Sequence, residues 1–198
     1  MVTGQSKEAG IDTGEPLCYI AHMKCIAHVL ITAAVLFSSA LLSGCGKTDE
    51  AGAAPAARND SPVAQSLGTF HSMMNAEFDP AADYYIYVQS ASWCGPCKAE
   101  MPELIAAYPE MKAAHVELIL IGLDGSEQEA LGYLQSFKAP FPGVHYKDSA
   151  LSNLPGFAIS RTVPHATIVD RQGKVIAKGH GSLALKWKQI TDADRAEK

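Results

Sequence analysis

The feature that most constrains the fold is a CxxC motif, Trp93-Cys94-Gly95-Pro96-Cys97-Lys98, between a predicted strand and a predicted helix. A helix N-terminus carries unpaired N–H groups and a partial positive charge, which stabilise a thiolate and lower its pKa. We therefore expect an exposed Cys94 to attack a disulfide and Cys97, one turn later, to resolve the mixed disulfide. Gly95 permits close approach of a partner chain, and Pro96 sets a helical φ without losing a hydrogen bond. The motif predicts a redox-active cysteine pair.

The other cysteines, Cys18, Cys25 and Cys45, all lie in the first quarter of the chain. The rest of the sequence therefore lacks the cysteines of a disulfide-stapled scaffold. A CxxC can also be half of a zinc site, but a second CxxC is absent from the sequence. The histidines after the first quarter are scattered rather than clustered: His71, His115, His145, His165 and His180. We therefore expect no metal ion and no cofactor.

Composition bounds the class of protein. The chain has 198 residues, 47% of them hydrophobic and 19% charged, which suits one domain with a core plus a leader or tail. The net charge is -5 and no run of Lys and Arg occurs, so nothing predicts binding to nucleic acid. We find no internal repeat and no second domain.

An apolar run over residues 26–42 predicts either a signal sequence or a short membrane span. The motif Leu42-Ser43-Gly44-Cys45 at its end resembles the bacterial lipobox, in which cleavage precedes a cysteine that carries lipid. We therefore assign residues 1–45 to a leader and lipoprotein signal, with Cys45 as the lipidation site. The alternative is an uncleaved transmembrane anchor. Both interpretations place the folded part outside the cytoplasmic membrane.

The leader also sets the domain boundaries. Residues 1–22 are more acidic than basic, which does not suit a signal sequence, so we place the natural start at Met23. Residues 46–66 are polar and rich in Ala, Pro and Gly, which predicts a flexible tether. A folded domain is then expected over residues 67–198. We expect it to be lipid-anchored in the cell envelope and to face the periplasm or the extracellular side, at the inner or the outer membrane.

Strands and helices alternate along the predicted domain and end in a hairpin. Apolar and β-branched runs predict strands over residues 84–88 and 116–121. Helices are predicted over residues 95–111, 126–137 and 183–196, the second opened by the capping box Ser126 and Glu129, and a hairpin joins strands at 166–169 and 174–177. This order predicts an α/β fold with a mixed sheet.

At this point a family resemblance is evident. The segment Ala91-Ser92-Trp93-Cys94-Gly95-Pro96-Cys97-Lys98-Ala99-Glu100-Met101-Pro102-Glu103-Leu104 resembles the active site of the TlpA/ResA-like branch of the thioredoxin superfamily. Gly122-Leu123-Asp124 resembles a strand end of the family, and Phe141-Pro142 resembles the end of its central insertion. Thr162-Val163-Pro164 resembles the loop with the family's cis-proline. The resemblance covers about residues 67–190 and implies a thioredoxin-like fold: a central mixed β-sheet flanked by helices, with the TlpA-like insertion.

The resemblance also implies roles for single residues. Cys94 would be the nucleophile and Cys97 the resolving thiol of a redox-active disulfide. Pro164 would be a cis-proline that faces the sulfurs and leaves the backbone of Val163 free to pair with a substrate strand; the alternative is a trans turn proline. Glu100 would be a partly buried carboxylate with a raised pKa that takes the proton from Cys97, unless it is a solvated helical glutamate.

The sequence departs from the family in two places. Gln89 and Ser90 stand where the family commonly has Phe-Trp, and Val88 stands where thioredoxin has a buried aspartate. The aspartate proton relay is therefore absent, which leaves Glu100, a water molecule or the leaving thiol to manage the proton. His165 follows Pro164 directly. It could stabilise a thiolate or shape substrate choice, but we interpret it as an exposed loop histidine.

The predicted function is a membrane-tethered thiol-disulfide oxidoreductase. Its partners would be disulfide-containing exported proteins and an upstream thiol electron donor, with the membrane bound through the lipid anchor. The Gly-Pro dipeptide between the cysteines resembles that of reducing thioredoxin, so we expect a reductase rather than an oxidase, although the reduction potential decides the direction. The alternatives are a peroxiredoxin-like peroxidase and a thiol chaperone that passes copper.

Overall fold

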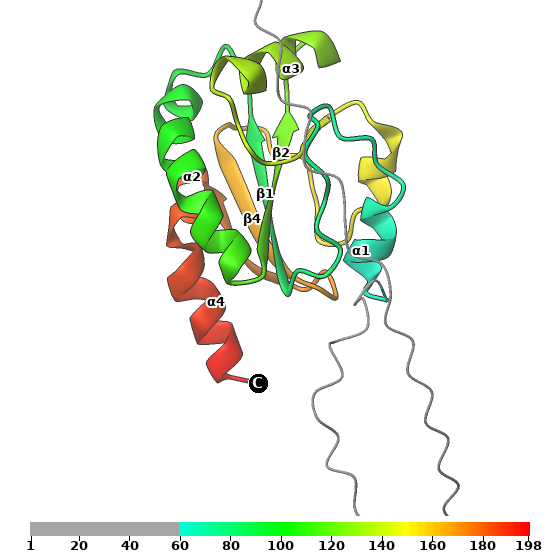
Figure 1. Cartoon of the computed structure of the whole chain (residues 1–198), viewed down its shortest axis with the longest axis vertical. Helices are drawn as coiled ribbons and strands as arrows, with labels where there is room; N and C mark the ends of the chain where they lie inside the picture. Colours follow the sequence, from blue (N-terminus) through cyan, green and yellow to red (C-terminus); the bar gives the residue numbers. More distant parts are fainter. Residues whose placement is uncertain (1–59) are drawn as a thin grey trace, which may run out of the picture. The chain divides into compact units, whose positions relative to one another are not determined.

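The structure is a computed structural model that describes residues 60–198. The predicted leader, the natural start at Met23, the lipidation site Cys45 and the tether up to residue 59 all lie outside these residues. Figure 1 shows the described part as a sheet with helices on both of its faces. None of its helices is both long enough and apolar enough to cross a membrane.

Five strands form one mixed sheet in the order β3-β2-β1-β4-β5. Parallel pairs join β1 to β2 and β2 to β3, and antiparallel pairs join β1 to β4 and β4 to β5. The strands are β1 (Tyr84–Ser90), β2 (Val116–Gly122), β3 (Gly143–His145), β4 (His165–Asp170) and β5 (Val175–His180). Every residue of β1 and β2 is buried, which explains their near-continuous apolar runs. The mixed sheet predicted from the sequence is confirmed.

Side chains of β1 alternate between the two faces of the sheet. Ile86 and Val88 pack with residues of α2 (Gly95–Ala113), α3 (Glu127–Ser136) and α4 (Trp187–Ala196). Tyr85 and Tyr87 pack on the other face, with residues of α1 (Pro62–Leu67) and of the 3₁₀ helix η1 (Ser149–Asn153). Figure 1 shows α2 and α4 on one side of the sheet and α1 on the other. This alternation is the period of two expected for a strand.

The predicted elements are confirmed with shifted ends, and the structure adds others. The capping box of α3 is present, since Ser126 and Glu129 each bond the backbone of the other. The predicted terminal helix is divided into the 3₁₀ helix η2 (Gly181–Lys186) and α4. Strand β3 and helix η1 were not predicted, because runs of three and five residues are too short for a periodic pattern.

The expected central insertion corresponds to α3 and β3, which lie between β2 and the C-terminal hairpin. Phe141 and Pro142 come directly before β3, and the buried Phe141 ring packs edge-on against Tyr108 of α2 at 5.5 Å between ring centroids. Strand β3 is the edge strand beside β2. The insertion therefore extends the sheet and contributes α3 to the core.

The predicted boundary between tether and domain is placed too late. Ser61 accepts a hydrogen bond from the N–H of Ala64 and caps α1, which begins at Pro62. Val63 and Leu67 of this helix are buried against β1. The described part of the predicted tether is thus folded onto the sheet. Its Ala- and Pro-rich composition concealed a helix with a serine cap and a proline in the first turn.

Candidate active site

Cys94 and Cys97 form a disulfide at the N-terminus of α2, with 5.2 Å between their Cα atoms. Cys94 is the N-cap residue, and its Sγ atom accepts a hydrogen bond of 3.2 Å from the N–H of Cys97. The same N–H can therefore stabilise a Cys94 thiolate once the disulfide is reduced. The predicted pairing and the predicted position at a helix start are both present.

Cys94 is less accessible than predicted. Cys94 is only 5% exposed in this disulfide form, and it packs with Cys97, Ala91, Leu123 and Val163. The expectation of an exposed Cys94 is therefore wrong for this state, because side chains of the loops around the disulfide cover the sulfur.

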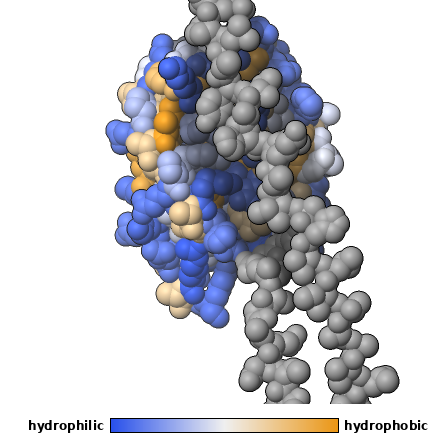
Figure 2. Space-filling model, viewed as in Figure 1, coloured by the Kyte–Doolittle hydropathy of each residue, from blue (hydrophilic) through white to orange (hydrophobic). Residues whose placement is uncertain are grey.

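Large hydrophobic side chains are exposed directly before Cys94 and in the loop before Pro164. Trp93 is 65% exposed, and Ile159 in the loop before Pro164 is exposed as well. The remaining large exposed hydrophobic side chain of the described chain is Val175 on β5. On the face in Figure 2 the described surface is largely hydrophilic, with apolar residues in small separate patches. Trp93 and Ile159 are thus two of the three large hydrophobic side chains that are exposed among residues 60–198.

The peptide bond between Val163 and Pro164 is cis, as the resemblance implied. Val163 is half-buried and packs against the cysteine pair, whereas Pro164 is buried. The carbonyl of Pro164 accepts a hydrogen bond of 3.0 Å from the N–H of Gly181. The cis-proline loop is therefore joined to the end of β5 on one side and faces the disulfide on the other.

Gln89 holds the segment that leads into the cis-proline loop. Its buried side-chain amide donates to the carbonyl of Ala158 at 2.8 Å and accepts from the N–H of Ser160 at 2.7 Å. The sequence showed Gln89 only as a departure from the family. The structure gives it a positioning role, since both ends of one buried amide are satisfied by the same loop.

Glu100 of α2 is partly buried, and its carboxyl and the Pro164 ring both lie close to Gly181. Glu100 follows Cys97 by three positions, which places both on one face of α2. Burial raises the pKa of Glu100, the charge of His180 opposes this shift, and the charge of Glu103 adds to it. The partly buried carboxylate with a raised pKa is therefore present as predicted, and its role as proton acceptor remains a proposal.

His165 differs from the prediction of an exposed loop histidine. It is the first residue of β4, is half-buried, and lies opposite His180 on β5 in the antiparallel register. Burial lowers the pKa of His165, and the nearby charges of Lys178 and His180 lower it further. The predicted strand began at residue 166, one residue later than β4 does, so His165 was assigned to the preceding loop.

Two further polar pairs lie near the loop that carries the cysteines. Ser92 donates to buried Asp124 at the end of β2, and the hydroxyls of Ser90 and Tyr133 lie 3.1 Å apart. Val88 lies in the apolar core, which agrees with the absence of the thioredoxin aspartate. Asp124, Tyr133, His180 and Gly181 were not predicted as site residues.

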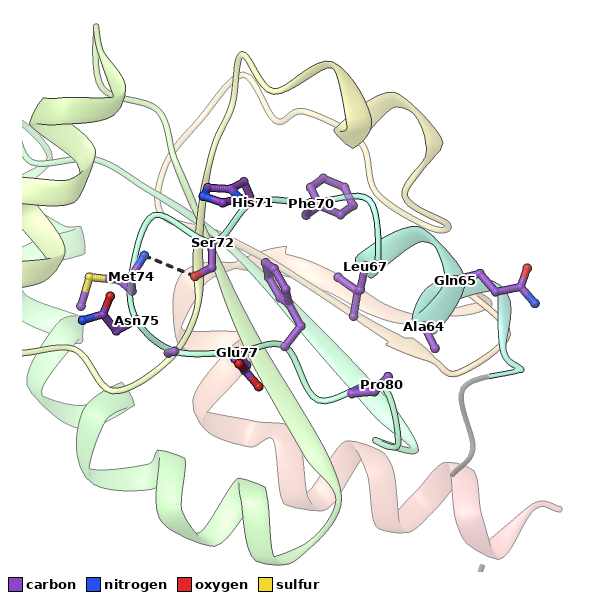
Figure 3. A pocket seen from close by; sticks show the side chains of 13 residues that line it. Ala64, Gln65, Leu67, Phe70, His71, Ser72, Met74, Asn75, Glu77 and Pro80 are labelled. Carbon is purple, nitrogen blue, oxygen red and sulfur yellow. Dashed lines mark hydrogen bonds between the residues drawn. The ribbon is translucent and has the colours of Figure 1, made fainter. Parts of the chain in front are cut away.

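Within residues 60–198, no group of three or more His, Cys, Asp or Glu side chains is arranged to hold a metal ion. A pocket of about 810 Å³ is lined by residues of the segment 64–80, which includes part of α1 and the chain that follows it. Figure 3 shows Leu67, Phe70 and His71 around it, with the Ser72 hydroxyl accepting from the N–H of Met74 at 3.3 Å. None of the site residues predicted from the sequence lines this cavity.

The arrangement defines a class of protein. A CxxC disulfide caps the helix that follows the central strand, and the residue before a cis-proline packs against it. Together with the mixed five-stranded sheet, this arrangement is a thioredoxin-like fold with a disulfide at the site.

Comparison with known proteins refines this class. Residues 82–175 match the family model described as thioredoxin-like. The chain is 38% identical over 95 residues to the thiol-disulfide oxidoreductase ResA of Oceanobacillus iheyensis, with 48% of each chain covered. It is 28% identical over 87 residues to ResA of Bacillus cereus, with 44% of this chain and 49% of that protein covered. The chain thus spans about half the length of these curated relatives.

Among solved structures, StoA from Bacillus subtilis is similar with a TM-score of 0.47 and 24% sequence identity, covering 56% of this chain and 83% of StoA. The sequence matches agree with the resemblance found in the CxxC segment. The match of residues 82–175 to the thioredoxin-like model and the similarity to ResA proteins over about half of their length support a TlpA/ResA-like protein of the thioredoxin superfamily.

Proposed function

We propose that the protein is a thiol-disulfide oxidoreductase that reduces disulfides of exported proteins. The observation that carries this proposal is the Cys94–Cys97 disulfide, which caps α2 and packs against the residue before the cis-proline. Relatives named thiol-disulfide oxidoreductase ResA support it. No cofactor is needed, because the two sulfurs carry both electrons.

The catalytic cycle begins with the dithiol. The Cys94 thiolate, held by the helix N-terminus and the N–H of Cys97, attacks one sulfur of a client disulfide, and the other client sulfur leaves as a thiolate. Glu100 takes the proton of the Cys97 thiol. The Cys97 thiolate then attacks Cys94, which reforms the disulfide and releases the second client thiolate. A dithiol donor returns two electrons and two protons to the pair.

Client recognition would combine apolar contact with backbone pairing. Exposed Trp93, directly before Cys94, offers apolar surface, and Ile159 in the loop before Pro164 is exposed as well. Pro164 has no N–H and is in cis, so the backbone of Val163 can pair with an extended client segment. This arrangement suits a disulfide in an unfolded or flexible segment of a protein.

The tether and the location are part of the same proposal. Lipid on Cys45, after the motif Leu42-Ser43-Gly44, would hold the domain at the outer surface of a membrane. This side chain is outside the described residues, and a labelling experiment tests it. Radiolabelled palmitate should be incorporated into the wild-type protein in a bacterial host and not into a Cys45→Ser variant. Labelling of the variant would contradict a lipid anchor at this position.

The reduction potential of the Cys94–Cys97 pair tests the direction of electron flow. Thioredoxin, a reductant, has a potential of about −270 mV, and the strong oxidant DsbA has one of about −120 mV. We expect equilibration with glutathione buffers to give a value closer to thioredoxin. A value close to the strong oxidant would overturn the proposed reductase.

A trapping experiment tests the separate roles of the cysteines. A Cys97→Ala variant lacks the resolving thiol, so it should accumulate mixed disulfides with client proteins on Cys94. The matched Cys94→Ala variant should accumulate none, because Cys97 is deeper in the site. If neither variant or only the Cys94→Ala variant forms adducts, the assigned roles are wrong.

A further inference from the structure

His180 lies between the partly buried carboxyl of Glu100 and solvent. Its Nδ1 atom lies 3.4 Å from Oε1 of Glu100. The Glu100 side chain is 16% exposed, whereas the His180 side chain is 61% exposed. The two residues come from different elements, since Glu100 is in α2 and His180 ends β5. An imidazole therefore lies between the partly buried carboxyl of Glu100 on α2 and the surrounding water.

The contacts of Nδ1 restrict where the proton can be. When a neutral ring carries its hydrogen on Nε2, the lone pair of Nδ1 can accept from the N–H of Ser182, which lies 3.3 Å away; the Ser182 hydroxyl lies 3.3 Å from the same nitrogen. A neutral ring of this kind can bond Glu100 only if the carboxyl is protonated. Conversely, a protonated ring can donate from Nδ1 to an ionised carboxylate. A single proton can therefore lie either on the Glu100 carboxyl or on Nδ1 of His180.

We propose that His180 is a positioning residue for the resolving step, through which the proton that Glu100 takes from Cys97 passes to solvent. The inference rests on the proposed dithiol function. The Cys97 thiol gives its proton to Glu100, and the thiolate displaces the client sulfur from Cys94. The client sulfur leaves with the electron pair of the broken bond and takes a proton from water. Glu100 passes its proton to Nδ1 of His180, and Nε2 releases one to solvent.

Several charged groups act on this pair besides Cys97. Glu103 lies on the same helix as Glu100, and the ionisation of Tyr133 on α3 is coupled to Glu100. Lys178 and His180 of β5 both act on His165 of β4, which therefore lies within electrostatic range of the imidazole. The ionisation of each of these groups affects how the rate of the resolving step depends on pH, so the test needs variants that change one group at a time.

The sign of the expected change follows from the charges. The His180 charge lowers the pKa of Glu100, against the larger effect of burial, which raises it. Without the imidazole the pKa of Glu100 rises further. Glu100 then remains protonated to higher pH and accepts the Cys97 proton only there. The rate of resolution should therefore reach its plateau at a higher pH.

His180 also caps η2, and this structural role can be kept. Its side chain accepts the hydrogen bond from the N–H of Ser182 as the N-cap residue. Asparagine is among the strongest N-cap residues and does not titrate. A His180→Asn variant thus retains the cap and removes the proton carrier.

The test uses the full-length protein in its reduced form with oxidised glutathione as the disulfide. Acid quenching and mass spectrometry follow the mixed disulfide on Cys94 from about pH 5.5 to about pH 9, the range in which His and thiols titrate. We expect His180→Asn to form the mixed disulfide at the wild-type rate. It should resolve it roughly tenfold more slowly near neutral pH, a smaller loss than the hundredfold or more typical of a direct acid–base group. A Glu100→Gln/His180→Asn double variant should match Glu100→Gln alone.

Two control variants show whether a changed pH dependence of the resolution rate is specific to His180. His71→Asn changes an exposed histidine outside the site and should behave as wild type. His165→Asn changes the imidazole opposite His180 and should not reproduce its profile. The inference is overturned if the His180→Asn profile superimposes on wild type or if His165→Asn shifts it equally. A wild-type protein that forms no mixed disulfide overturns the proposed function and the inference with it.

Discussion

Ser92 donates two hydrogen bonds to the same oxygen of Asp124, from its N–H at 3.0 Å and from its hydroxyl at 2.6 Å. Ser92 comes two residues before Cys94, and Asp124 follows β2, so the pair fixes the cysteine loop to the neighbouring strand. The other carboxylate oxygen of Asp124 is buried without a hydrogen-bond partner among residues 60–198. A buried charge that is only half satisfied is costly, which indicates that the tie to the loop outweighs this cost.

Replacing Asp124 should therefore loosen the loop. We expect Asp124→Ala to lower the free energy of unfolding by about 1–3 kcal/mol, because the N–H and hydroxyl of Ser92 lose their acceptor. Asp124→Asn keeps an acceptor oxygen and removes the charge, so it should retain most of the stability. Urea unfolding of the three proteins measures the difference. Equal loss in the Asn and Ala variants would contradict the hydrogen-bond explanation.

Gly181 is where the end of β5 meets the site. A Cβ atom at this position would overlap Oε2 of Glu100 and Cβ of Pro164. Gly181→Ala should thus displace one or both, destabilise the domain by about 1–3 kcal/mol and slow the resolving step. Gly179→Ala, two residues earlier on β5, is a matched control, since a Cβ there meets no atom within 4 Å. Equal stability and equal rates in the two variants would show that the close approach at Gly181 has no importance.

Local signals in the sequence predicted much of this site. The CxxC, the proline that proved to be cis and the capping box of α3 each depend on a few neighbouring residues. The contact of His180 with Glu100 does not, since it depends on the register of β5 against β4 and on where α2 passes. Likewise, the role of Gln89 becomes visible only once the loop around Ala158 folds back over β1. Long-range register, rather than residue type, separates the predicted from the unpredicted part of the site.

A buried ionic cluster should contribute strongly to stability. Fully buried Glu117 accepts hydrogen bonds from Lys112 at 2.9 Å and from the Tyr108 hydroxyl at 2.8 Å. Glu117→Ala leaves both donors without this acceptor, so we expect a loss of about 3 kcal/mol or more in the free energy of unfolding. The exposed pair of Glu110 and Lys188 is the control, and its removal by Glu110→Ala should cost less than about 1 kcal/mol. Similar losses of unfolding free energy for the two variants would contradict the expectation that the buried contacts of Glu117 contribute more than the exposed ion pair.

His165 should make stability depend on pH. Its folded-state pKa is lowered by burial, so the unfolded chain takes up a proton on this residue at a higher pH than the folded protein does. The free energy of unfolding is unaffected by His165 above its unfolded-state pKa of about 6.5, where the imidazole is neutral in both states. It decreases as the pH falls through this value toward the lower folded-state pKa. His165→Asn should therefore lose less stability than wild type when urea unfolding is compared at about pH 7.5 and about pH 5.5. His71→Asn serves as the control, and an identical pH dependence in His165→Asn and wild type would contradict the prediction.

Gly95 should matter only when a protein client binds. A Cβ atom at Gly95 would meet no atom of the protein within 4 Å, so Gly95→Ala should not destabilise the fold. The proposed client chain must approach this position, however, and a methyl group there should slow reduction of insulin by about tenfold, which corresponds to about 1.4 kcal/mol. Oxidised glutathione is small enough to avoid the methyl group, so its reduction should stay at the wild-type rate. Gly132→Ala on α3, where a Cβ also meets nothing, should affect neither substrate. If Gly95→Ala reduces insulin as fast as wild type does, the client does not pass over Gly95.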